Sequence, residues 1–452
     1  MQQSEAWRDL DQRLRAMQDL LRGSGVSDLN LPLALFSLKY LIQEPMFLER
    51  LSHRSEQPVE RMSDLRSVEN LAWTFENTVR WEDRPFTKYL LGDLSRVGSG
   101  IGGELLSQLN SPVPPSEVAP WLHERAQSID LQLGNNTPRE LARMIASLTS
   151  CDCASRIFDP SCGTGSLLLA ASETYHNRLA IIGHELNGYA RSWTRVRLAL
   201  SGLWDADLSP TEPWNPSGTD EFRPTRQYDV VLSNPPFGAQ LQLDGIQHSY
   251  TLKYLGAHSK SGRISSELAY LLTSYHHLAE NGAAAILMPL GVLFRTGMDS
   301  SVRKALVDED AVDAVIALPA RLSAPVTTIE TAIIILRRRK SDVGTLLIDA
   351  RHLGVRHGQR VVLDEEATDK ILDVYRHRTV EPGFSTVVDT SDLMAQDFNL
   401  APSRYIEQLP TATVDVSVRR DHIATLDRQS RQLLDEYEAL IETLMVDTRQ
   451  RQ

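Results

Sequence analysis

The spacing of apolar residues changes along the chain and divides it into three parts. Up to about residue 130, apolar side chains recur every three or four positions, as at Leu35, Leu38 and Leu41, and strand-like alternation is scarce. This spacing is typical of amphipathic helices. We therefore predict a helical N-terminal domain over residues 1–130.

From residue 131, short apolar runs alternate with helical stretches. This alternation predicts an α/β fold with a doubly wound, mostly parallel sheet and helices on both faces. In such sheets, ligands bind at the carboxyl ends of the strands. We assign residues 131–410 to this domain. The runs expected to form strands are 156–159, 180–183, 229–233, 283–288, 314–318 and 331–336.

The C-terminal part, residues 411–452, has a third pattern. Its apolar positions step alternately by three and four residues, which predicts a helical tail with a heptad seam. A seam of this kind needs a partner helix, either from this chain or from another subunit. The seam positions are Ile423, Leu426, Ser430, Leu433, Tyr437, Leu440 and Leu444.

A glycine-rich loop, Asp159-Pro-Ser-Cys-Gly163-Thr-Gly165-Ser, follows the first predicted strand. Gly163 and Gly165 let the backbone turn sharply and approach a ligand closely. Glu185 ends the next predicted strand about twenty residues downstream, where it can bind ribose hydroxyls. The pattern predicts a nucleoside-binding site. An ordinary strand-turn-helix with incidental glycines is the simpler alternative.

The charge of Asp159 indicates which nucleoside fits this loop. A dinucleotide would bring a pyrophosphate that the carboxylate repels, and would need a small residue where Leu168 stands. S-adenosylmethionine instead carries an amino group and a sulfonium next to its adenosine. We predict this cofactor, with Asp159 facing the amine, the glycine loop the methionine part and Glu185 the ribose.

Upstream of the glycine loop, Asn136-Thr137-Pro138-Arg139-Glu140 has the pattern of a capping box with proline at the first helical position. It predicts the start of a helix. The free amides of that helix start can also receive the carboxylate of the cofactor. The two roles are compatible.

A second loop, Ser233-Asn234-Pro235-Pro236-Phe237-Gly238, follows the predicted strand 229–233. Its prolines make it rigid, and it lies at the sheet edge where the cofactor is expected. The Asn234 side chain and the Pro235 carbonyl can accept both hydrogens of an exocyclic base amine, which aims its lone pair at a methyl group. Phe237 offers a face on which an extruded base can stack. A simple turn is the alternative.

Charge and cysteine content limit which partners, metal sites and cellular compartment are compatible with the sequence. With 47 Lys and Arg against 59 Asp and Glu, the net charge is -12, and the field of the whole molecule repels polyanions. Binding to DNA therefore needs a more basic partner or local cationic loops, for which Arg337-Arg-Arg-Lys340 is one candidate. Three cysteines suit neither a disulfide framework nor zinc. Without an apolar N-terminal segment, we expect a cytoplasmic protein that does not enter a membrane.

The two loops together resemble those of amino-methylating DNA methyltransferases, in particular the adenine-specific modification subunit of type I restriction-modification systems. The order of further motifs is also similar to that of the family. These motifs are Leu35-Phe-Ser-Leu-Lys-Tyr-Leu41, Thr137-Pro138, Met288-Pro-Leu-Gly-Val-Leu-Phe-Arg295, Ala314-Val-Ile-Ala-Leu-Pro319, Asp397-Phe-Asn-Leu400 and Arg404-Tyr405.

This resemblance implies a Rossmann-like, S-adenosylmethionine-dependent methyltransferase fold that methylates the N6 amine of adenine in DNA, without a metal. It implies double-stranded DNA and a sequence-recognition (specificity) subunit as partners, and it allows for a restriction subunit and a second copy of this chain. The cofactor contacts would be Thr137, Asp159, Gly163, Gly165, Glu185 and Asp220. The adenine would be held by Asn234, Pro235, Pro236 and Phe237.

Two other functions are compatible with these motifs. An RNA base or a protein glutamine also presents a weakly nucleophilic nitrogen, so either is an alternative substrate. A non-catalytic scaffold of a defence complex that retains the fold is the other possibility.

Overall fold

A computed structural model describes most of the α/β part of the chain and several N-terminal helices. Contacts divide the chain into two compact units, residues 1–406 and 407–452. Asp220, Asn136 and the seven predicted seam positions lie outside the described residues, as do the domain boundaries predicted near residues 130 and 410. The described residues are 4–23, 30–43, 91, 99–110, 113–114, 117–122, 124–125, 137–149, 154–175, 179–214, 227–243, 253–255, 262–322, 324, 328–407, 428 and 431–432.

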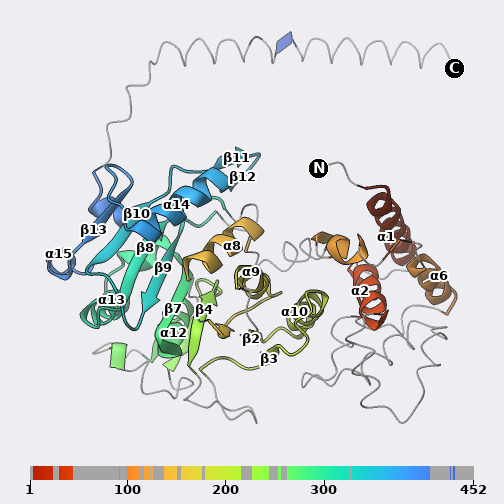
Figure 1. The fold of residues 1–452 in the computed structure, drawn as a ribbon, viewed down its shortest axis with the longest axis horizontal. Coiled ribbons are helices and arrows are strands. Elements are labelled where there is room, and N and C mark those ends of the chain that lie inside the picture. The colour runs from red at the N-terminus through yellow and green to blue at the C-terminus, as the bar shows by residue number, and fades with distance from the viewer. Residues whose placement is uncertain are drawn as a thin grey trace. The chain divides into compact units, whose positions relative to one another are not determined.

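In the described part of the chain, nine strands form one sheet in the order β13-β10-β8-β9-β7-β4-β1-β2-β3 (Figure 1). Each of the six predicted runs coincides with a strand. Strands β3, β10 and β13 were not predicted. The bounds are β1 Arg156–Asp159, β2 Ala180–His184, β3 Asp207–Ser209, β4 Tyr228–Ser233, β7 Leu278–Pro289, β8 Val312–Ala317, β9 Thr331–Arg337, β10 Thr345–Asp349 and β13 Ser385–Val388.

The sheet is mostly parallel, as predicted. Strand β9 is the main exception, since it runs antiparallel to both β7 and β8. The connection from β8 to β9, residues 318–330, contains no described helix, whereas a crossover to a parallel strand is usually made by a helix. At the sheet edge, β13 is antiparallel to β10.

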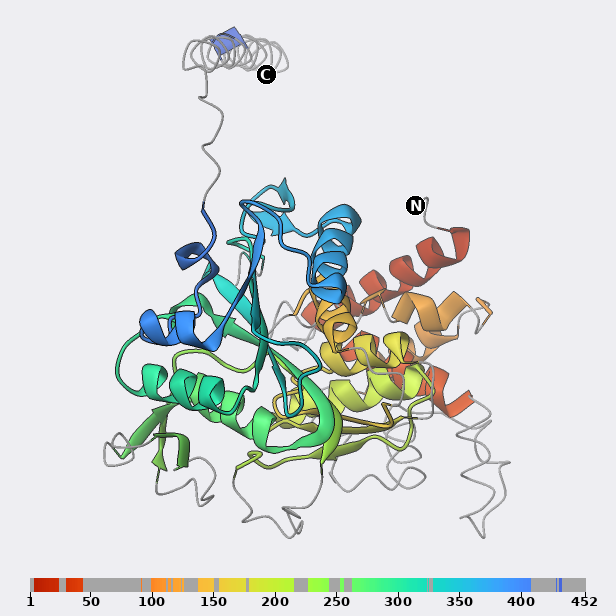
Figure 2. The same ribbon diagram turned by 60° about the vertical axis from the view of Figure 1, so that its left-hand side comes forward.

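Helices cover both faces of the sheet (Figures 1 and 2). Helices α8, α9 and α14 bury apolar side chains in a core on one face, and α12, α13 and α15 do so on the other. The doubly wound architecture is therefore confirmed. These helices are α8 Arg139–Leu148, α9 Ser166–Thr174, α12 Ser266–His276, α13 Met298–Asp308, α14 Glu365–His377 and α15 Thr390–Ala395.

The N-terminal part is helical where it is described. Helices α1 (Glu5–Gly23), α2 (Leu31–Gln43) and α6 (Ser99–Leu109) share a core with α10 (Gly188–Leu200). Trp193 and Val196 of α10 are fully buried in this core. Helix α10 therefore joins the N-terminal helices to the α/β part. None of the helices in the described ranges is long and apolar enough to span a bilayer.

Two short hairpins and two 3₁₀ helices complete the described elements. One hairpin lies next to the loop that follows β4, and the other follows β10. The elements are β5 Gln240–Gln242 with β6 Arg263–Ser265, β11 Val355–His357 with β12 Arg360–Val362, η5 Leu290–Leu293 and η6 Pro402–Arg404.

Candidate active site

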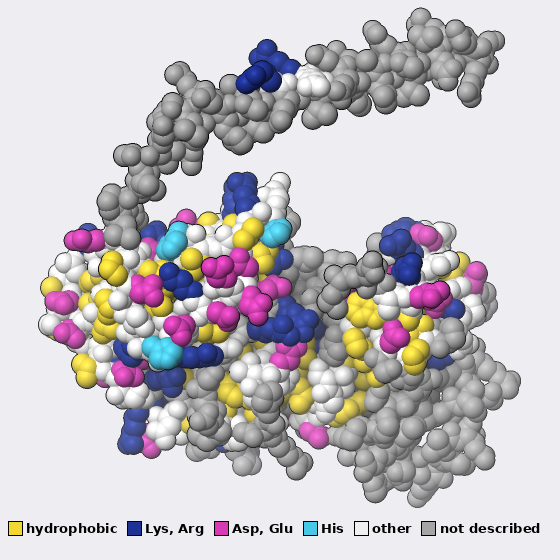
Figure 3. Space-filling view, turned by 45° about the horizontal axis from the view of Figure 1, so that its top comes forward, with side chains coloured by type: hydrophobic (Ala, Val, Ile, Leu, Met, Phe, Trp, Pro, Cys, Tyr) yellow, Lys and Arg dark blue, Asp and Glu magenta, His cyan; other side chains and the backbone are white. Residues whose placement is uncertain are grey.

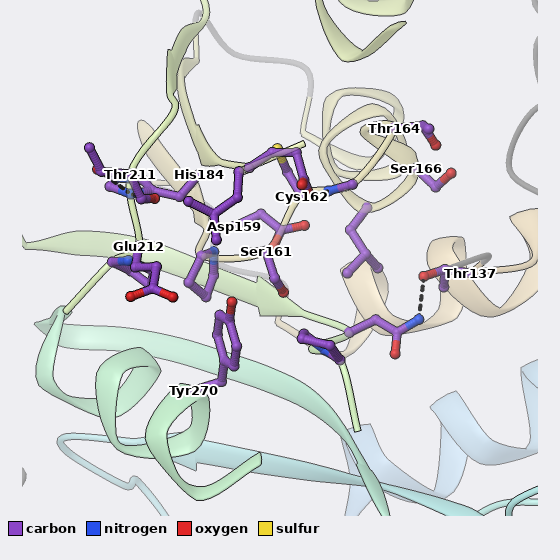
Figure 4. A pocket seen from close by; sticks show the side chains of 18 residues that line it. Thr137, Asp159, Ser161, Cys162, Thr164, Ser166, His184, Thr211, Glu212 and Tyr270 are labelled. Carbon is purple, nitrogen blue, oxygen red and sulfur yellow. Dashed lines mark hydrogen bonds between the residues drawn. The ribbon is translucent and has the colours of Figure 1, made fainter. Parts of the chain in front are cut away.

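A pocket opens at the carboxyl ends of β1, β2, β3 and β4. Figure 4 shows Thr211, His184 and Glu212 at one end and Thr137 at the other, with Asp159 and Ser161 between them. The pocket brings together six of the ten predicted site residues: Thr137, Asp159, Gly163, Glu185, Asn234 and Pro236.

Asp159 ends β1 and is 1% exposed. Its Oδ1 accepts a hydrogen bond from the Ser161 amide at 2.9 Å, whereas its Oδ2 is buried without a partner among the described groups. Burial, reinforced by the nearby Glu185 charge, raises the pKa of Asp159 to about 8. An unpaired carboxylate oxygen in a pocket is costly, so a hydrogen-bond donor in a ligand would stabilise it.

The two glycines of the loop have different structural roles. Gly163 (φ 55°) lines the pocket, and a side chain there would meet nothing within 4 Å. Gly165 (φ 86°) does not line the pocket but lies against α10, where a Cβ would come within 2.8 Å of Thr194 Cγ2. Glycine at position 165 therefore permits close packing of the loop on α10. The positive φ of this residue also favours glycine.

Glu185 holds the glycine loop to β2. Its Oε2 accepts a hydrogen bond from the Gly163 amide at 3.0 Å, and its Oε1 accepts one from the Asn187 amide at 2.7 Å. Burial raises the pKa of this carboxyl group, although these amides oppose the shift. Each carboxylate oxygen has a second lone pair, so both can also accept from ribose hydroxyls.

Four residues that the sequence did not single out line the far end of the pocket: His184, Thr211, Glu212 and Tyr270. Thr211 and Glu212 follow the three-residue strand β3, which is too short to show a pattern in the sequence. Glu212 accepts a hydrogen bond from Trp214 Nε1 through one oxygen, at 3.1 Å. Asp220, predicted as a further cofactor contact, lies outside the described residues.

The pocket residues fit S-adenosylmethionine. The unpaired Asp159 Oδ2 suits the amino group, and the outward lone pairs of Glu185 suit the ribose. Leu186, which lines the pocket and is 57% exposed, offers an apolar surface for the adenine ring. A cationic ligand matches two neighbouring carboxylates better than a phosphate would. No cluster of His, Cys, Asp and Glu side chains suited to a metal ion occurs in the described ranges.

Asn234 is fixed by a residue 97 positions earlier in the chain. Its Nδ2 donates a hydrogen bond to Thr137 Oγ1 at 2.9 Å, drawn as a dashed line in Figure 4. The amide nitrogen is thereby held towards α8, which leaves Oδ1 as the acceptor for a substrate. Thr137 is 6% exposed, so this contact is largely shielded from water.

The predicted capping box is wrong in detail. Helix α8 begins at Arg139 with Pro138 as its N-cap, and none of the described side chains caps the helix. The proline therefore precedes the helix instead of occupying its first turn. The Thr137 hydroxyl binds Asn234, because a tertiary contact in a buried position replaces the local one.

The start of α12 holds the far half of the Asn234 loop. Ser266 Oγ donates to the Pro236 carbonyl at 2.8 Å, and the Gly238 amide donates to Glu267 Oε1 at 2.9 Å. Glu267 is 2% exposed. Two side chains thus fix the loop backbone on either side of Phe237, and no local pattern in either segment predicts these contacts.

The remaining members of the loop differ in exposure. Pro235 is buried, and Phe237 is half-buried against the core that α8 and α9 share. Neither lines the pocket. Their predicted contacts with adenine therefore stay predictions.

The cationic run Arg337–Lys340 is not a DNA-facing loop. Because β9 is antiparallel, Arg337 pairs with Ala283 near the start of β7, at the edge opposite to Asn234. Arg338 donates to the carbonyls that end α12, Arg339 pairs with Glu280, and Lys340 pairs with Asp310. The run stabilises the amino edge of the sheet, so this prediction was wrong.

Comparisons with known proteins agree with this geometry. Residues 125–413, well over half of the chain, match the model of the family described as N-6 DNA methylase. The type I restriction enzyme MpnII methylase subunit of Mycoplasma pneumoniae is 25% identical over 332 residues, which are 69% of this chain and 60% of that protein.

A second relative and a solved structure are also similar to this chain. The type I restriction enzyme MjaVII methylase subunit of Methanocaldococcus jannaschii is 25% identical over 343 residues, 68% of this chain and 56% of that protein. This chain thus spans less than two thirds of either relative. The type I restriction-modification methyltransferase subunit from Streptococcus thermophilus shares the fold, with a TM-score of 0.68, 22% identity and coverage of 89% of this chain and 100% of its own. The chain belongs to the N-6 DNA methylase family.

Proposed function

We propose that this chain transfers a methyl group from S-adenosylmethionine to the N6 amine of an adenine in DNA. It would act as the modification subunit of a type I-like restriction-modification or related defence complex. The observation that carries the proposal is the hydrogen bond from Asn234 to Thr137, which presents Asn234 Oδ1 in the same pocket as the unpaired oxygen of Asp159.

In this proposal, Asp159 binds the amino group of the cofactor, Glu185 binds its ribose, and the loop containing Gly163 surrounds its methionine part. Bound S-adenosylmethionine supplies an electrophilic methyl group. The exposed apolar side chain of Leu186 shields the adenine of the cofactor from water on one side. Thr137 would serve the reaction through Asn234.

Asn234 and Pro235 would raise the reactivity of the adenine amine. Its lone pair is delocalised into the ring, so the amine is a weak nucleophile. Asn234 Oδ1 and the Pro235 carbonyl each accept one of its hydrogens, which favours a geometry with the lone pair directed out of the ring plane. The methylated nitrogen is acidic and loses a proton, so no general base is needed before methyl transfer.

An adenine in duplex DNA must leave the stack to reach Asn234. The loop that receives it is rigid, because two prolines, Ser266 and Glu267 fix its backbone. We propose that the base stacks on Phe237. A preorganised loop avoids the cost of ordering at the moment of reaction.

The proposed protein partners are inferred from the net charge of this chain and from the names of its relatives. We propose that a specificity subunit supplies the sequence recognition and most phosphate contacts, since this chain has a net charge of -12. A restriction subunit and a second copy of this chain complete the proposed assembly. The curated relatives are named as methylase subunits of type I restriction enzymes, which supports this arrangement.

The test is methyl transfer by the purified chain, alone and with its specificity subunit. Labelled S-adenosylmethionine is mixed with DNA, RNA or host protein, and mass spectrometry identifies the labelled group. We expect N6-methyladenine in DNA with the wild type and none with Asn234→Ala, although both bind the cofactor. Label in RNA or in protein glutamine would contradict the proposal, as would no transfer under either condition despite cofactor binding.

A further inference from the structure

Exposed arginines stand at the same edge of the sheet as Asn234. Arg295 follows β7 and η5, Arg321 follows β8, and Arg356 lies in the hairpin after β10. In the described part of the chain, none of these three guanidinium groups forms an ion pair, unlike the run Arg337–Lys340 at the opposite edge. The charges of Arg321 and Arg356 are therefore available to an anionic partner, and that of Arg295 is shared with a nearby carboxylate, Asp299 in the first turn of α13.

The hairpin β11–β12 connects two of these arginines to the active site. The Val361 amide donates to the Arg321 carbonyl at 3.2 Å, so the hairpin lies against the loop after β8. Arg360 of the hairpin pairs with Glu140 at 3.7 Å. Glu140 lies in the first turn of α8, next to Thr137, which binds Asn234.

Arg295 follows η5, on the face of the sheet opposite to α8. Strand β7 is the direct parallel neighbour of β4, and η5 packs in the core that α12 and α13 share. The Arg295 guanidinium lies over Gly291, where a Cβ would be 2.7 Å from Nε. Gly291 thus leaves room for Arg295 to lie flat on the backbone, with Phe294 beside it 48% exposed.

We propose that Arg295, Arg321 and Arg356 bind the DNA backbone on the two sides of the target adenine. This inference rests on the proposed function, because it assumes that DNA is the substrate. Phosphate contacts of this kind fix the position and orientation of the duplex without reading its sequence. They bring the adenine to Asn234 although the whole chain is acidic.

The three arginines come from separate elements at this edge of the sheet. Arg295 follows β7, Arg321 follows β8, and Arg356 lies in the hairpin after β10. Arginines on separate elements can reach different phosphates.

The surrounding charge restricts where DNA can lie. Helix α14, which follows the hairpin, exposes Glu365, Glu366, Asp369 and Asp373. Figure 3 shows dark-blue side chains projecting where the hairpin lies and magenta side chains gathered over the neighbouring α14. The acidic helix repels phosphate, so the duplex is directed away from α14 and towards the catalytic loop.

The test measures the affinity of the full chain for a labelled DNA duplex over a series of salt concentrations. We compare the wild type with Arg295→Gln, Arg321→Gln, Arg356→Gln and the triple variant. The matched control is Arg339→Gln, an exposed arginine at the opposite edge that pairs with Glu280. Binding of S-adenosylmethionine, measured separately, shows that each variant is folded.

Each edge substitution is expected to reduce the slope of log affinity against log salt by about 0.9, and the triple variant by about 2.7. Arg339→Gln should leave the slope unchanged. An unchanged slope in the triple variant overturns the inference, as does an equal loss in the control or no binding of the wild type at low salt. If the wild type methylates adenine but the triple variant keeps the wild-type slope, only this inference is overturned. If the triple variant has a smaller slope but the wild type methylates no adenine, only the proposed function is overturned.

Discussion

Replacing Thr137 by valine tests whether this residue orients Asn234 or binds the cofactor. Valine has nearly the same shape but cannot accept the hydrogen bond from Asn234 Nδ2, now 2.9 Å long. The site is 6% exposed, so water does not readily replace the lost acceptor. An unsatisfied buried donor costs about 1–3 kcal/mol, and if this cost falls on the reactive orientation of Asn234, kcat drops roughly 5- to 150-fold.

The assay is single-turnover methyl transfer, with the dissociation constant of S-adenosylmethionine measured on the same preparations. We expect Thr137→Val to lower the rate and to leave cofactor affinity within about twofold, since its part in catalysis is to hold Asn234. Thr137→Ser keeps the hydroxyl and should retain most of the rate. A large loss of cofactor affinity with an unchanged rate would show instead that Thr137 is a cofactor ligand.

Three further predictions concern the rest of the pocket. The pKa of Asp159 is raised to about 8, so its carboxyl group is protonated at lower pH. It must lose this proton to bind the amino group of S-adenosylmethionine. The affinity for S-adenosylmethionine should therefore rise with pH up to about 8. Calorimetry in buffers of different ionisation enthalpy should show this proton release at neutral pH, and Asp159→Asn should abolish it. In Glu267→Gln, the side-chain NH₂ group can face the Gly238 amide, which needs an acceptor, so kcat should fall several-fold with cofactor affinity unchanged. A normal kcat would show that Glu267 does not position the loop. Gly165→Ala should lower the free energy of unfolding by about 1–3 kcal/mol in urea titrations, because of its positive φ and the contact with Thr194, and more than Gly163→Ala, where no atom lies within 4 Å.

The sequence predicted the parts of the site that depend on strand ends. Asp159 ends a strand with a clear apolar pattern, Glu185 and Asn234 each follow one, and parallel strands bring their carboxyl ends to one edge. The same logic found six strands of the sheet. Strand β3 was missed because its three residues show no period, and Thr211 and Glu212 were missed with it.

Contacts between distant segments could not be predicted. Thr137 was assigned to a helix cap by a local rule, whereas its partner lies 97 residues away. Glu267 reaches Gly238 from 29 residues downstream, and nothing in either segment signals the contact. The run Arg337–Lys340 was predicted as a cationic loop for DNA because the antiparallel direction of β9, which puts the end of this strand at the opposite edge of the sheet, was not foreseen.

We propose that the pocket around Asn234 methylates adenine in DNA at sites chosen by a partner subunit. Single-molecule sequencing of genomic DNA from a strain that carries this gene with its neighbours would show both the modified base and its sequence motif. We predict N6-methyladenine at one defined sequence motif, and its disappearance when the gene encodes Asn234→Ala. Genomic DNA without N6-methyladenine, or the same modified motif in the Asn234→Ala strain, would contradict the account.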